Sequence, residues 1–182
     1  MSEPATVADV LPQMAASRPE ATAIYFPGKR RGADGLLEYT QISYRELDQR
    51  SDRIAAGLHA VGIKRGDRAV LMVKPSPDLF ALTFAMFKAG VVPVMIDPGL
   101  GKAGLAQGIS RARPSAFIGI PVAHLARKAL GWGRETVTRT VSVGGWGLGD
   151  VSLAKVEALG AEALTRGSAR EVTGSTSPDE VA

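Results

Sequence analysis

Two glycine-rich segments contain residue types that can hold phosphate groups. Residues 144–150 read Gly-Gly-Trp-Gly-Leu-Gly-Asp between a predicted strand and a predicted helix, where a phosphate-binding loop would lie. The spacing does not give G-x-G-x-x-G and no Gly-Lys-Ser/Thr follows, so we interpret the segment as a flexible turn anchored by Trp146. Residues 173–176, Thr-Gly-Ser-Thr, lack a second glycine and a following lysine, and we interpret them as tail.

Isolated polar side chains are the other candidates for chemistry. Asp97 ends a predicted buried strand, where ligand crevices of parallel sheets form, but a carboxylate that caps the turn at residues 98–99 explains it better. His59 and His124 lie in predicted helices with no partner that the sequence can name, and Ser51 lies on an apolar helix face without a base. We therefore assign no catalytic residue and no metal ligand, and the cofactor-binding residues stay unknown.

Composition narrows the function classes. The 182 residues include no cysteine, which excludes a disulfide scaffold, a zinc ribbon, an iron–sulfur site and a cysteine nucleophile. Residues 1–149 carry 19 Lys and Arg against 12 Asp and Glu, whereas residues 150–182 carry 3 against 6. The longest basic run is residues 29–31 and aromatic residues make up only 5%, so we expect a solvated basic surface and no nucleic-acid partner.

The clearest predicted helix begins after Ser43. Residues 43–46, Ser-Tyr-Arg-Glu, form a capping box, and apolar residues between Leu47 and Val61 recur at helical spacing on one face. Its charged residues are expected on the outer side: Asp48, Arg50, Asp52 and Arg53. Ahead of it, strands over 21–26 and 38–43 flank a basic loop and predict a hairpin.

Beyond this helix, predicted strands and helices alternate. The strands span 69–73, 91–96, 116–120 and 138–143, and the helices span 79–89, 102–113, 121–130 and 151–164. The helix at 79–89 is apolar nearly all round, which predicts that it is sandwiched. This alternation indicates an α/β fold: a mostly parallel, doubly wound sheet with flanking helices, plus a short N-terminal β-hairpin.

One stretch approaches the length of a membrane-spanning helix. Residues 79–96 contain Lys88 as their only charge, but Gly90 and Pro93 interrupt them, so a buried helix followed by a buried strand fits better. Residues 1–4 lack the basic and apolar regions of a signal peptide. We expect no transmembrane segment and a cytoplasmic location.

Three stretches, in order and spacing, resemble one enzyme family. Residues 42–47 read I-S-Y-R-E-L and continue to I-A-A-G-L at 54–58; residues 62–69 read G-I-K-R-G-D-R-A; and residues 87–98 read F-K-A-G-V-V-P-V-M-I-D-P. They are similar to motifs of the AMP-binding superfamily of adenylate-forming enzymes, which includes acyl-CoA synthetases, and the resemblance covers roughly residues 5–145. F-I-G-I-P at 117–121 resembles a narrower branch, the fatty acid–CoA ligase-like proteins that include olefin-pathway β-lactone synthetases.

The resemblance covers only the first part of such enzymes. Family members also have a second α/β subdomain, a small barrel, a mobile lid, and a phosphate loop that ends in Gly-Lys. No position of this chain matches a catalytic residue of the family, and the matched motifs are structural. We therefore expect residues 1–164 to form the first α/β subdomain, and residues 165–182 to form a polar tail or linker toward a second one.

The resemblance implies a whole enzyme that uses ATP and Mg²⁺ to form an acyl-adenylate from a fatty or related carboxylic acid. The adenylate would then give an acyl-CoA or a β-lactone. We expect this fragment to be inactive alone, to dock the downstream subdomains, and to self-associate through an exposed apolar face. The alternatives are a non-catalytic binding or interaction module that receives an anionic ligand such as CoA, and a half-enzyme that works in trans.

Overall fold

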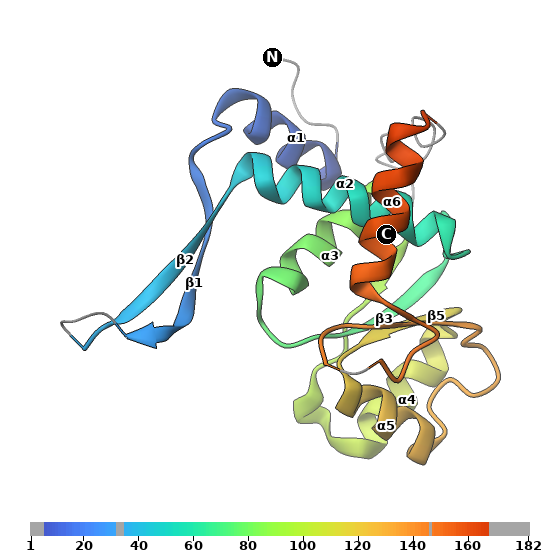
Figure 1. Cartoon of the computed structure of the whole chain (residues 1–182). Coiled ribbons are helices and arrows are strands. Elements are labelled where there is room, and N and C mark those ends of the chain that lie inside the picture. Colours follow the sequence, from blue (N-terminus) through green and yellow to red (C-terminus); the bar gives the residue numbers. More distant parts are fainter. Residues whose placement is uncertain (1–5, 32–34, 146, 168–182) are drawn as a thin grey trace.

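The computed structural model describes residues 6–31, 35–145 and 147–167 (Figure 1). Its centre is a five-stranded parallel sheet in the order β4-β3-β5-β6-β7. The strands are β3 (Arg68–Met72), β4 (Val92–Val94), β5 (Ala116–Gly119), β6 (Arg139–Ser142) and β7 (Val151–Ser152). The predicted α/β class with a mostly parallel sheet is confirmed.

Helices cover both faces of this sheet. In Figure 1, α2 (Tyr44–Ala60), α3 (Pro77–Lys88) and α6 (Leu153–Thr165) lie on one side, and α4 (Gly101–Ala112) and α5 (Pro121–Leu130) lie on the other. A short helix α1 (Val7–Ser17) packs on α2 and α3, and a 3-10 turn η1 (Pro98–Leu100) precedes α4. Because neighbouring strand residues point to opposite faces, Leu71 joins the core under α2 and α3, whereas Val70 joins the core under α4.

Local signals account for the start of α2. The Ser43 side chain accepts a hydrogen bond from the backbone N–H of Glu46, and the Glu46 carboxylate accepts one from the Ser43 N–H at 2.8 Å. These hydrogen bonds lower the pKa of Glu46. The predicted capping box is therefore confirmed.

The charged residues of α2 do not simply face solvent, so that prediction is wrong. Lys88 of α3 is 5% exposed and its ammonium contacts the carboxylates of Asp48 and Asp52 at 2.7 and 2.6 Å. Arg50 pairs with Asp78 of α3 and Glu157 of α6. Burial alone would lower the pKa of Arg50, but its hydrogen bonds to these two carboxylates raise it. Helical periodicity could not show this, because α3 and α6 cover the flanks of the helix.

Two glycines let α2 and α6 cross closely. A Cβ on Gly160 would overlap the carbonyl oxygen of Arg53, and a Cβ on Gly57 would overlap the carbonyl oxygen of Val156. Without Cβ atoms, the two backbones meet directly. Helix α6 is thereby packed directly against α2, and Val156 of α6 is fully buried.

Other boundaries differ from the prediction. The two residues of β7 extend the sheet where the sequence predicted the start of a helix, and α6 begins at Leu153, with Ser152 as its cap. Helix α3 is not fully sandwiched, because Phe80 is 45% exposed. Within the described residues, no helix combines the length and apolar character needed to cross a membrane.

The predicted N-terminal hairpin is present but longer. Strand β1 (Thr22–Arg31) pairs with β2 (Leu37–Ser43) in antiparallel register, with Ile24 opposite Ile42. The pair forms a separate two-stranded sheet that extends away from the helices in Figure 1. Residues 36–41 are all exposed. A two-stranded ribbon of this kind is marginally stable by itself in water.

Candidate functional site

The carboxyl edge of the parallel sheet is the candidate site. In open parallel sheets, ligands bind outside the carboxyl ends of the strands. At this edge, β3 ends at Met72, β5 ends at Gly119 and β6 ends at Ser142, while α3, α4 and α5 begin. The structure brings Asp97, the first turn of α5, and Gly144 and Gly145 after the end of β6 to this edge.

Asp97 serves the turn after β4. Its Oδ1 accepts a hydrogen bond from the backbone N–H of Gly99 at 2.7 Å, and the residue is exposed. This bond closes an Asx-type turn into η1. The turn interpretation from the sequence is confirmed, and this hydrogen bond gives Asp97 a structural role.

His124 is held in the core between α5 and the sheet. It is fully buried, its Nε2 lies 3.0 Å from the carbonyl oxygen of Val141, and its ring meets that of Phe117 edge-on with centroids 5.2 Å apart. Burial is the main reason that the pKa of His124 is lowered, so the imidazole is neutral near pH 7. A neutral ring donates from Nε2 to the carbonyl, which is the arrangement of a packed core histidine.

The other candidates lie apart from His124. The Nε2 of His59 lies 3.2 Å from the carbonyl oxygen of Ala89, and Ser51 is buried and donates its hydroxyl to the carbonyl oxygen of Asp48 at 2.8 Å. Both residues belong to α2, on the opposite face of the sheet from His124. The structure therefore brings no nucleophile, base and orienting carboxylate together among these residues.

The glycine-rich segment returns the chain from β6 to the start of β7. Gly144 and Gly145 have positive φ, and a Cβ on Gly149 would lie 2.9 Å from the backbone nitrogen of Ser142. Asp150 then accepts a hydrogen bond from the Thr140 N–H at 2.9 Å, and its own N–H donates to the Thr140 hydroxyl. The glycines thus allow the backbone to run back close beside β6. Trp146 and residues 173–176 lie outside the described residues.

Exposed apolar side chains are the most prominent feature of the carboxyl edge. Met95 is 55% exposed, Leu100 is 61% exposed, and Val122 and Leu125 of α5 are 61% and 60% exposed. The sequence analysis predicted an apolar face but not its residues. The sequence could not identify them, because an apolar residue after a strand or in a helix gives the same pattern whether its side chain is buried or exposed.

At the carboxyl edge, the described residues do not fit ATP and Mg²⁺. Among these residues, no three His, Cys, Asp or Glu side chains gather as a metal site. The glycine-rich segment at 144–150 has no Gly-Lys at its end, and its glycines are explained by the return to β7. No chemical step is therefore assigned to this region.

Comparison with known proteins places this geometry in a family. The family model for AMP-binding enzyme matches residues 11–181. The chain belongs to the AMP-binding enzyme family. It is 53% identical over 161 residues to an olefin beta-lactone synthetase from Xanthomonas campestris pv. campestris, covering 86% of this chain and 28% of that protein. It is 47% identical over 166 residues to the same enzyme from Stenotrophomonas maltophilia, covering 89% and 30%.

Solved structures agree with the fold of an AMP-binding enzyme. A long-chain-fatty-acid-CoA ligase from Archaeoglobus fulgidus matches with a TM-score of 0.73 at 20% identity, covering 89% of this chain and 32% of that chain. Coronafacic acid ligase from Pectobacterium brasiliense matches with a TM-score of 0.67 at 18% identity, covering 83% and 29%. The chain spans less than a third of the length of the curated relatives described above. The resemblances found in the sequence, to the superfamily and to its β-lactone synthetase branch, are confirmed.

Proposed function

We propose that this chain is the N-terminal part of an ATP-dependent ligase that activates a fatty or β-hydroxy carboxylic acid as an acyl-adenylate. The observation that carries this proposal is the 53% identity to an olefin beta-lactone synthetase of which the chain covers only 28%. The adenylate would go on to a β-lactone or an acyl-CoA. ATP and Mg²⁺ would be held by downstream parts of the enzyme, together with CoA where it is the acceptor.

The described region contributes a scaffold in this proposal. It presents two surfaces that suit docking of the downstream subdomains. One is the set of exposed apolar side chains at the carboxyl edge, and the other is a hollow of about 640 Å³ between α1, β1 and α3. Tyr25 and Phe80, at 63% and 45% exposure, line this hollow beside the protruding hairpin. Exposed apolar area of this kind marks interaction surfaces in soluble proteins.

The free strand edges of the hairpin support the same interpretation. Strands β1 and β2 pair only with each other within the described residues, so their outer N–H and C=O groups can accept a further strand. The isolated chain is therefore expected to self-associate through its exposed apolar surfaces. The division of the chain at residue 164 and a cytoplasmic location stay predictions.

ATP–pyrophosphate exchange tests the proposed activity. The reaction would be run with a panel of fatty and β-hydroxy acids on this chain and on the same chain extended by downstream ligase sequence. We expect exchange only in the extended protein, because catalysis needs phosphate positioning and cation clamps. Exchange by the 182-residue chain would refute its inactivity, and silence of a folded, extended protein with every acid would refute acid activation.

A further inference from the structure

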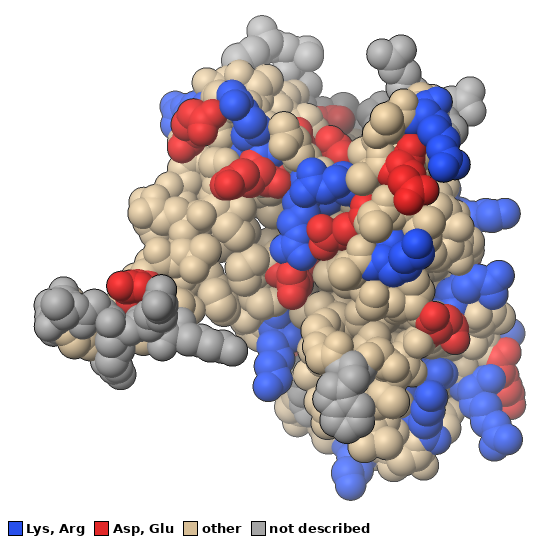
Figure 2. Space-filling model, in the orientation of Figure 1, with Lys and Arg blue, Asp and Glu red and all other residues tan. Residues whose placement is uncertain are grey.

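Cations gather at the amino edge of the sheet, where the strands begin. Helices α2 to α5 all end at this edge, because each leads into the next parallel strand. Nine basic residues lie in these helix ends, turns and strand starts: Lys64, Arg65, Arg68, Arg111, Arg113, Arg127, Lys128, Arg134 and Arg139. In Figure 2, blue side chains follow the right-hand side of the molecule, where α2 ends in Figure 1.

Helix dipoles and carboxylates do not balance this charge. Four helix C-termini supply about −0.5 each, or about −2 together. The carboxylates of the edge are Asp67, Glu135 and Asp150. Two of them are engaged locally, because Asp67 accepts hydrogen bonds from the Lys64 N–H and the Ser115 hydroxyl, and Asp150 is bonded to Thr140. A clear positive excess remains.

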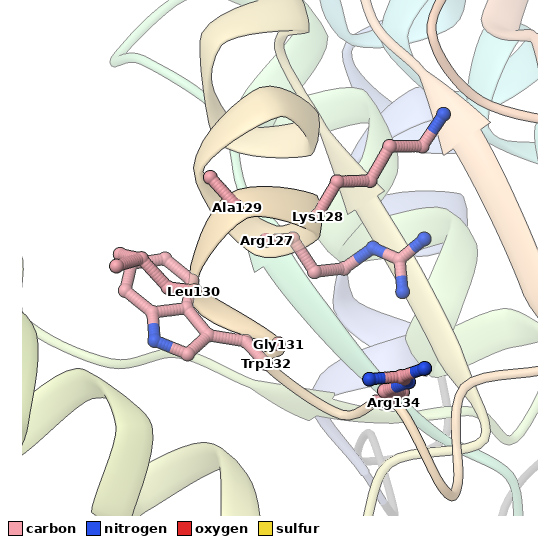
Figure 3. A pocket seen from close by; sticks show the side chains of 7 residues that line it. All are labelled: Arg127, Lys128, Ala129, Leu130, Gly131, Trp132 and Arg134. Atoms are coloured by element: carbon pink, nitrogen blue, oxygen red, sulfur yellow. The ribbon is translucent and has the colours of Figure 1, made fainter.

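A hollow lies within this basic edge, at the end of α5. It has a volume of about 520 Å³, and Arg127, Lys128, Leu130, Trp132 and Arg134 are among its lining residues, none of which is acidic. Figure 3 shows Arg127, Lys128 and Arg134 extending to one side of the end of α5, and Leu130 and Trp132 to the other. Between described residues, none of the ion pairs involves these three cations.

Arg127 is held in place before any ligand arrives. Its guanidinium carbon lies 5.6 Å from the centre of the Phe117 ring, which is itself fully buried. The Arg127 Nε is buried and has no hydrogen-bond partner within the described part of the chain. A buried donor without a partner is costly, and an acceptor that enters the hollow would relieve that cost.

The donor set fits a phosphate group better than a carboxylate. Two guanidinium forks and one ammonium offer more N–H donors than the two oxygens of a carboxylate can accept. A phosphate monoester brings three acceptor oxygens and close to two negative charges. We propose that this hollow binds the phosphate group of a small phosphorylated ligand, with Arg127 and Arg134 as its forks and Lys128 at its rim. This site does not depend on the adenylation activity proposed above.

Titration of the isotope-labelled chain with inorganic phosphate tests the site directly. The Arg127 Nε–H signal and the backbone amides of residues 131–134 should shift along saturable curves. Glycerol 3-phosphate should shift the same signals, while acetate at equal ionic strength should shift them weakly. Shifts that rise linearly without saturation, or equally with acetate, would overturn the proposal.

Two substitutions distinguish phosphate binding in the hollow from nonspecific attraction to positive surface charge. Arg134→Gln removes an exposed cation of the hollow and should weaken phosphate binding about tenfold, the scale of one charge-assisted fork. Lys102→Gln removes another exposed cation, in α4, that does not line the hollow, and should leave the dissociation constant unchanged. Equal weakening by both, or none by Arg134→Gln, would refute the assignment. Arg127→Gln should abolish saturation while the circular dichroism spectrum stays folded.

Discussion

The two edges of the parallel sheet carry opposite chemistry. At the carboxyl edge, the exposed side chains include Met95, Val122 and Leu125, and the carboxylates of Asp97 and Asp78 are engaged, by the turn after β4 and by Arg50. At the amino edge, cations crowd the helix ends and carboxylates are few. Apolar surface is suited to permanent cover by more protein, whereas unpaired cations are suited to a charged ligand that binds reversibly.

The first test contrasts the buried cation of α3 with the exposed cations of the amino edge. Lys88→Met should destabilise the fold by about 2 to 3 kcal/mol, below the range for fully buried pairs because Asp52 is 36% exposed. Urea unfolding at pH 7 measures the loss. Adding Asp48→Asn and Asp52→Asn to this variant should recover most of it, because no buried charge is then left unpaired. A loss of under about 0.5 kcal/mol for the single variant would contradict a stabilising role.

The second test uses the neutral histidine at the start of α5. Because the pKa of His124 is lowered by folding, the unfolded chain binds its proton more readily. The contribution of His124 to the free energy of unfolding is therefore fully present above pH 6.5. It falls as the pH drops below 6.5, by up to about 1.4 kcal/mol per pH unit. Urea midpoints between pH 7.5 and 5.5 should show this slope in the wild type and lose most of it in His124→Gln. An unchanged slope in the variant would assign the effect to other groups.

The third test asks whether the apolar carboxyl edge is an interface. Val122→Ser and Leu125→Ser together should reduce self-association in sedimentation velocity, while changing the unfolding free energy by no more than about 0.5 kcal/mol each. A matched pair at the other edge, Arg113→Gln with Arg134→Gln, should leave self-association unchanged. An entirely monomeric wild-type chain at high concentration would remove the basis for this prediction.

The smallest effect concerns repulsion at the amino edge. Arg134→Gln should raise the unfolding free energy by a few tenths of a kcal/mol at low ionic strength, since one of several like charges is removed. The gain should vanish at about 1 M salt, where the screening length is about 3 Å. Thermal unfolding across a salt series measures it. A destabilised variant at low salt would show that Arg134 has a partner that the structure does not reveal.

Local signals predicted most of the fold. The capping box at Ser43 and the Asp97 turn depend on residues three or fewer apart, so the sequence displays them directly. Strand β7 was missed because two residues carry no periodicity, and Val151 reads equally well as part of the helix that follows. The ion pairs of Lys88 were missed because they join α3 to α2 across 36 and 40 residues.

The cluster of cations at the amino edge was not predicted for a related reason, although the sequence contained a pattern that indicates it. Its cations are scattered singly from Lys64 to Arg139, so no run of charge marks them. Arg111, Arg127 and Lys128 nevertheless fall in the last turns of their helices, and in an alternating α/β chain every such turn arrives at the same edge. Applying the topology to the charges would have predicted the cluster.

The close crossing of α2 and α6 at Gly57 and Gly160 affects the order in which the chain can fold during its synthesis. Gly57 meets its partner helix only after Gly160 has been made, 103 residues later. At about 5 to 20 residues per second, α2 leaves the ribosome many seconds before α6 exists. During that interval the face of α2 that carries Gly57 lacks α6, the helix that covers it. The part of the core between α2 and α6 therefore cannot close until nearly all of the described region has emerged from the ribosome.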